Sequence, residues 1–160
     1  MTPLNAEAQL RLAAVGWQIG SRDDERAQRL HLAIAAYRSP GGLVHTVHPA
    51  AVEAWARYAS LRIGQEGAGV ELALCTFSFD PLDAIHTAHG CAVFSAQMNR
   101  PMAPLGTLDD GEAVVLIDSA GRVFSRDHTG DWLLGIDVDA AVNTLTSGTA
   151  FIRVKENGTY

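Results

Sequence analysis

The hydrophobic pattern of this chain changes its period near Leu61. Before that residue, apolar side chains recur every three or four positions, which is the spacing of one face of a helix. From Leu61 onward, short apolar runs are bounded by glycine or by turn-forming residues, which is typical of strands. Helices followed by a group of strands predict an α+β fold rather than an alternating βαβ fold.

Three helices are expected before this change. Gly16 is placed to end the first, which carries an apolar stripe from Leu4 to Val15. Ser21 and Asp24 form a capping pair for the second, which breaks at residues 39–42. Pro49 suits the first turn of the third, within "HPAAVEAWARYA".

The clearest strand signal is "AVVLIDSAGRVFSR", residues 113–126. Asp118 favours the first position of a type I turn and Gly121 can take the positive φ that follows, so this stretch predicts a β-hairpin. The runs "WLLGI" (132–136) and "AFIRV" (150–154) predict a further strand and an edge strand.

The remaining segments complete the expected fold. Strands are predicted in "LRI" (61–63), "VELALCTFSF" (70–79) and "CAVFSA" (91–96), with a capped helix over residues 80–90. Asp137 and Gly148 delimit a C-terminal helix. The prediction is one domain over residues 1–160, in which a largely antiparallel sheet packs with N-terminal helices and a C-terminal helix.

Charge and hydropathy narrow the class of function. The chain has 12 basic and 18 acidic residues and a net charge of −6, with no basic stripe, which argues against a nucleic-acid binder. Its apolar runs are far shorter than the roughly 20 residues that span a bilayer, and residues 1–16 do not resemble a secretory signal. We therefore expect a cytoplasmic protein that does not bind membranes.

The residues that most often carry catalysis or metal form no strong motif. Cys75 and Cys91 lie in apolar surroundings without a C-x-x-C spacing and are expected to be buried free thiols. Two His-x-x-His spacings, in residues 45–48 and 86–89, could join His128 in a zinc or iron site. Such spacings are common by chance, so we favour surface or capping histidines and expect no metal.

An acidic group surrounds the predicted hairpin and would cluster if the hairpin forms. Such loop carboxylates are most often only solvated, but they can also contact a basic partner. Trp132 beside them could be an aromatic anchor or part of the core. The candidate partner-binding residues are Asp109, Asp110, Glu112, Asp127, Asp131 and Trp132.

Six stretches together resemble a SUKH-3 immunity protein, of the SMI1/KNR4-like (SUKH) superfamily. Their order and approximate spacing carry the resemblance, which covers about residues 10–150. They are "VGWQIG" (15–20), "HPAAVEAWARYASLRI" (48–63), "FSFDPLDA" (77–84), "APLG" (103–106), "AVVLIDSAGRVFS" (113–125) and "LLGIDVDAAVNTLTSG" (133–148).

The resemblance implies a bacterial protein that is not an enzyme and that binds and neutralises the toxin domain of a polymorphic toxin system, often a nuclease or deaminase. It implies no catalytic residues, cofactor or small-molecule substrate. Two alternatives remain open at this stage. One is a small metal-dependent enzyme that uses the histidine pairs, and the other is a scaffolding or regulatory SMI1/KNR4-like module with a different protein partner.

Overall fold

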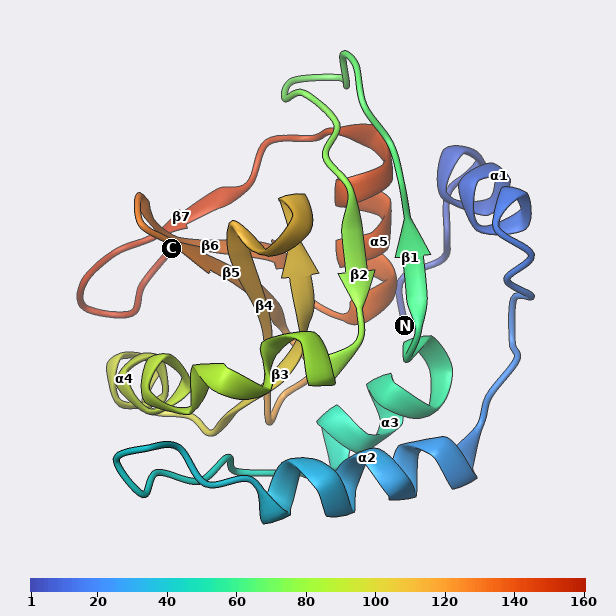
Figure 1. The fold of residues 1–160 in the computed structure, drawn as a ribbon. Coiled ribbons are helices and arrows are strands. Elements are labelled where there is room, and N and C mark those ends of the chain that lie inside the picture. The colour runs from blue at the N-terminus through green and yellow to red at the C-terminus, as the bar shows by residue number, and fades with distance from the viewer.

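Each strand of the protein pairs with the strand that precedes it along the chain. The computed structural model describes residues 1–160 and contains one seven-stranded sheet of order β1-β2-β3-β4-β5-β6-β7, antiparallel throughout (Figure 1). The strands are β1 (Leu61–Ile63), β2 (Phe77–Phe79), β3 (Met102–Leu108), β4 (Ala113–Asp118), β5 (Val123–Asp127), β6 (Gly130–Gly135) and β7 (Ile152–Val154).

Three helices precede β1, and the others lie between β2 and β3, between β3 and β4, and between β6 and β7. Polar side chains fix where most of them begin, because an oxygen or nitrogen acceptor satisfies a free N–H of the first turn. Asp23, not Ser21, caps the second helix, because its carboxylate accepts from the Arg26 N–H at 2.8 Å. The helices are α1 (Ala6–Ala14), α2 (Asp24–Ala36), α3 (Pro49–Tyr58), the 3-10 segments η1 (Pro81–Thr87) and η2 (Asp109–Gly111), α4 (Ala88–Met98) and α5 (Val138–Ser147).

The sheet buries both of its faces. Along β4, Val115 and Ile117 enter a core of 26 buried residues that the sheet shares with α1, α2, α3 and α5. Leu116 points the other way, into a core of seven buried residues that includes Phe94 of α4 and Phe124 of β5. Figure 1 shows α5 and α4 on opposite sides of the strands. The expected α+β fold is therefore confirmed, as a sheet between two helical layers.

Two stretches predicted as strands are not strands over their full length. Residues 91–96 belong to α4, where Cys91 and Phe94 are buried and Val93 is 42% exposed, because a helix turns residues three apart to one face. Of residues 70–79, only Phe77–Phe79 forms a strand. The preceding loop folds back on itself through a bridge between Ala68 and Ala73.

The inner strand β3 was not predicted. All seven of its residues are buried, so no alternation of apolar and polar residues marks it in the sequence. Pro104 and Gly106 also interrupt the run, and the register with β4 shifts between them. A Cβ atom added to Gly106 would lie 1.8 Å from the Ser78 carbonyl oxygen, so this position requires glycine.

Gly106→Ala should lower the free energy of unfolding by about 3 kcal/mol, because β2 and β3 would have to move apart. Gly90→Ala is the matched control. An added Cβ at Gly90, inside α4, would meet nothing within 4 Å, and alanine should leave stability unchanged or raise it by up to about 1 kcal/mol. Urea denaturation of both variants measures the difference, and equal effects would contradict this explanation of β3.

Candidate partner-binding surface

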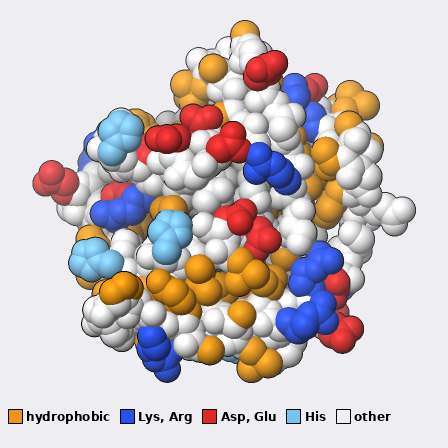
Figure 2. All heavy atoms as spheres, in the orientation of Figure 1, with side chains coloured by type: hydrophobic (Ala, Val, Ile, Leu, Met, Phe, Trp, Pro, Cys, Tyr) orange, Lys and Arg blue, Asp and Glu red, His pale blue; other side chains and the backbone are white.

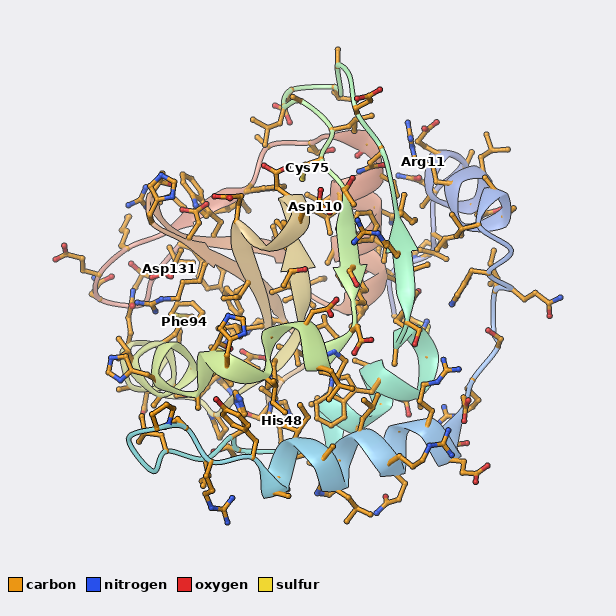
Figure 3. All side chains as sticks on the ribbon, in the orientation of Figure 1. Arg11, His48, Cys75, Phe94, Asp110 and Asp131 are labelled. Atoms are coloured by element: carbon orange, nitrogen blue, oxygen red, sulfur yellow. The ribbon has the colours of Figure 1, made fainter.

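Two turns of the sheet bring most of the predicted acidic residues to one end of the molecule. Because β3 to β6 are antiparallel neighbours, the β3–β4 turn and the β5–β6 turn lie at the same end of the sheet. Figure 2 shows acidic side chains gathered on the exposed face near these turns, and Figure 3 places Asp110 there. We call this group the acidic end: Asp109, Asp110, Glu112 and Asp127.

The β3–β4 turn has an unusual backbone that turns its carboxylates outward. Asp109 and Asp110 have φ values of 49° and 53°, in the left-handed region that aspartate tolerates better than most residues. The Asp109 N–H donates to the Thr76 carbonyl at 2.7 Å, which ties the turn to the loop before β2. Asp109, Asp110 and Glu112 are all exposed.

The exposed acids of this turn differ in how far they are neutralised. Arg62 of β1 pairs with Asp110 at 2.6 Å, but both side chains are more than half exposed, so the pair contributes little to stability. Asp109 and Glu112 take part in no ion pair of the structure. Their charges are therefore available to a partner.

Asp127 is held in one orientation by its own turn. Its Oδ1 accepts from the Thr129 N–H at 2.6 Å, the Thr129 hydroxyl at 2.5 Å and the Gly130 N–H at 3.1 Å. Burial acts to raise the pKa of the Asp127 carboxyl, but these hydrogen bonds outweigh it and lower that pKa below the ordinary value. The carboxylate therefore stays charged, and its Oδ2 takes no hydrogen bond.

Strand alternation separates the last two candidate residues, Asp131 and Trp132. Asp131 pairs in register with Val154, whose side chain belongs to the core under α4. Its side chain is 13% exposed, and Oδ1 lies 3.5 Å from the Arg126 guanidinium. Burial raises the pKa of Asp131 against the opposing effect of Arg126. Asp131 is thus turned away from the exposed acids, toward α4.

Trp132 points to the other face and lines an open hollow of about 280 Å³. The other lining residues come from the loop before β2, the β5–β6 turn and the segment before β7. Leu72 and Phe151 were not predicted as part of this site, because they are distant in sequence from Trp132. We call this feature the Trp132 hollow: Leu72, Asp127, Thr129, Trp132, Ala150 and Phe151.

His45 and His48 make structural contacts and are buried, so the expectation of surface or capping histidines holds for His48, as a cap, and is wrong for His45. The His45 ring, which is buried, places Nε2 2.6 Å from the Ile85 carbonyl oxygen. His48 caps α3 by accepting the Ala51 N–H at Nδ1, and its Nε2 lies 3.2 Å from the Ile117 carbonyl oxygen. No group of three or more histidine, cysteine, aspartate or glutamate side chains is arranged to hold a metal ion. The histidine spacings therefore do not support the metal-dependent enzyme.

Both cysteines are free thiols, as predicted, but only Cys91 is buried as expected, because Cys75 is partly exposed. Burial raises the pKa of Cys91 to about 11 and also raises the pKa of the half-buried Cys75. Since a thiol is nucleophilic only as its thiolate, neither residue is activated at neutral pH.

A buried polar cluster that was not predicted links two helices behind the sheet. Asp139 of α5 is 3% exposed and accepts hydrogen bonds from the Tyr58 hydroxyl and, at 2.8 and 3.0 Å, from Arg57 of α3. Trp17 stacks on Tyr58 with ring centroids 5.0 Å apart. The carboxylate of Asp139 has hydrogen-bond donors in Arg57 and Tyr58, so we interpret this cluster as part of the structural scaffold and not as a binding site.

Comparison with known families decides what this scaffold is. A protein family described as "SUKH-3 immunity protein" matches residues 4–148 of the chain. The chain belongs to the SUKH-3 immunity protein family. The match includes both turns of the acidic end and ends before Phe151 and β7. Comparisons with curated proteins and with solved structures gave no significant match. None of the helices is long and apolar enough to cross a membrane.

The buried histidines predict how the stability of this SUKH-3 protein depends on pH. Burial lowers the pKa of His45 and His48, so below their unfolded value of about 6.5 the unfolded chain binds protons that the folded chain does not. The free energy of unfolding should therefore fall between pH 7 and 5, by at most about 1.4 kcal/mol per pH unit for each histidine.

His48→Asn tests this effect, because asparagine can still cap α3 but does not titrate. Urea denaturation at several pH values should give a shallower pH dependence for the variant than for the wild type. Identical slopes would show that His48 is not a source of the effect.

Proposed function

We propose that this protein neutralises a nuclease or deaminase toxin domain of a polymorphic toxin system by binding it through the acidic end. Membership of an immunity protein family supports the general function. The observation that carries the proposed site is the presence, at one end of the sheet, of two exposed acids without ion pairs, Asp109 and Glu112, beside the fixed carboxylate of Asp127.

Electrostatics favour a partner that acts on nucleic acids. Enzymes that bind nucleic acids place lysine and arginine where the phosphates lie, and an acidic surface is complementary to that arrangement. The net charge of −6 adds to the attraction over longer distances and increases the rate of association. The acidic end would then occupy the surface that the toxin uses for its substrate.

Inhibition by occupation needs no chemistry from the immunity protein. The two cysteines are protonated at neutral pH, and the buried Asp139 is engaged by Arg57 and Tyr58. The proposed mechanism is therefore stoichiometric binding, in which one copy of this protein covers one toxin domain.

Rescue of growth tests the proposed function in cells. The C-terminal domain of the protein encoded immediately upstream should stop the growth of a sensitive host, and co-expression of this chain should restore it. A one-to-one complex should then co-purify. Toxicity that this chain does not relieve would contradict immunity, and a partner that is not toxic would favour a scaffolding module.

Charge reversal tests the acidic end. Asp109→Lys with Glu112→Lys should weaken binding to that domain by about 10- to 100-fold, mainly through slower association, with the largest effect at low salt. Glu25→Lys with Glu53→Lys, on α2 and α3, is a control matched in charge, and because these acids pair with Arg29 and Arg22, unfolding curves must first show that it is folded. Each variant exchanges two acids for two lysines and changes the net charge from −6 to −2.

Surface plasmon resonance at several salt concentrations compares the two double variants. Equal losses would show that only the net charge matters, and unchanged binding by the Asp109 and Glu112 variant would move the interface elsewhere.

A further inference from the structure

The walls of the Trp132 hollow are fixed by backbone hydrogen bonds. In the loop before β2, the N–H groups of Val70 and Leu72 donate to the carbonyls of Ser147 and Gly148 at 2.9 and 2.8 Å. Gly69 packs so closely on Gly148 that a Cβ added to it would lie 2.6 Å from the Gly148 Cα. The hollow therefore exists before any partner arrives, and a partner need not order it.

The lining of the hollow is apolar on its walls and acidic on its rim. Leu72, Ala150, Phe151 and the Trp132 ring supply apolar surface, and Leu72 is 39% exposed. Asp127 lines the hollow with its Oδ2 free of hydrogen bonds. A second carboxylate, that of Glu71, accepts from the Ala150 N–H at 2.8 Å and so lies next to the rim.

This combination fits one kind of side chain. Arginine has an apolar stem, and its planar guanidinium both stacks on aromatic rings and pairs with carboxylates. The protein already places arginine over aromatic rings, because the Arg153 guanidinium lies 4.7 Å from the centre of the Trp132 ring and that of Arg126 lies 5.6 Å from the centre of the Phe94 ring. Arg153 does not line the hollow, and its charge acts on Asp131.

We infer that the Trp132 hollow receives an arginine side chain of the toxin domain. The stem of that arginine lies against Leu72 and Phe151, and its guanidinium pairs with Oδ2 of Asp127. The inference rests on the proposed function and names the contact that anchors the partner beside the acidic end. Arginine and tryptophan are enriched among the few residues that dominate the affinity of protein interfaces.

Other classes of ligand fit the hollow less well. Its volume of about 280 Å³ lies below the range of about 300–1,000 Å³ that is usual for small-molecule sites, and it is open to solvent. The carboxylates of Asp127 and Glu71 would repel phosphate groups, which disfavours nucleic acids and anionic lipid surfaces. The apolar walls and the acidic rim are both complementary to a cationic side chain of a protein.

Leu72→Arg tests the inference, because the new guanidinium would lie beside Asp127. It would occupy the position of the partner's arginine or repel that arginine. The matched control is Leu82→Arg on η1, where the leucine is similarly exposed, at 44% against 39%. Both changes keep the backbone hydrogen bonds of their segments. Ala150→Trp, at an exposed position, fills the same hollow without adding charge.

Isothermal titration with the C-terminal domain encoded immediately upstream gives the affinities, after unfolding curves have established that each variant is folded. Leu72→Arg and Ala150→Trp should each weaken binding by about 30-fold or more, and Leu82→Arg should stay within about twofold of the wild type. Wild-type affinity in both hollow variants, or equal losses in all three, would overturn the inference and leave the proposed function standing. Failure of the wild type itself to bind would overturn both.

Discussion

Burial of the sheet on both faces is the constraint on which the rest of this structure depends. The residues of β4 alternate between a large core shared with α1, α2, α3 and α5 and a smaller core covered by α4. A strand of this kind cannot carry binding residues on either face without opening a core. The two edge strands, β1 and β7, have only three residues each and offer little backbone for pairing. The surfaces that remain for recognition are the turns at the ends of the sheet and the partly buried start of β6, where Trp132 lies.

The two ends of the sheet use aspartate in opposite ways. At the β4–β5 turn, Asp118 is fully buried, accepts from the N–H groups of Ala120 and Arg122, and pairs with the Arg122 guanidinium. Its charge is satisfied inside the protein and holds the hairpin. At the acidic end, Asp127 uses one oxygen for its turn and leaves the other free. The same residue type is therefore fully used by the scaffold at one end and keeps a carboxylate oxygen without a hydrogen bond at the other, and this contrast agrees with the interface that we propose.

Local patterns predicted much of this fold, and long-range packing limited the rest. The Asp118 to Gly121 turn and the Asp137 cap depend on residues within a few positions, and both were predicted. Part of the helix at residues 88–98 was mistaken for a strand. Its residues are nearly all small or apolar, so the helical period and the strand period fit equally well. Strand β3 was missed because every residue is buried. At the candidate site, the predicted hairpin was enough to place most of the acids at one end of the sheet. The Trp132 hollow could not be predicted, because it depends on contacts between residues about 80 positions apart, such as Glu71 with Ala150, which no local pattern reveals.

Hydrogen exchange of the complex tests the central claim most directly. Amide exchange of this protein should be compared with and without the C-terminal domain encoded immediately upstream, at concentrations that saturate the complex. Our account predicts that added protection concentrates in residues 69–73, 109–112, 127–132 and 149–152, which form the acidic end and the Trp132 hollow. Protection confined to α2 and α3, with these turns unchanged, would contradict it.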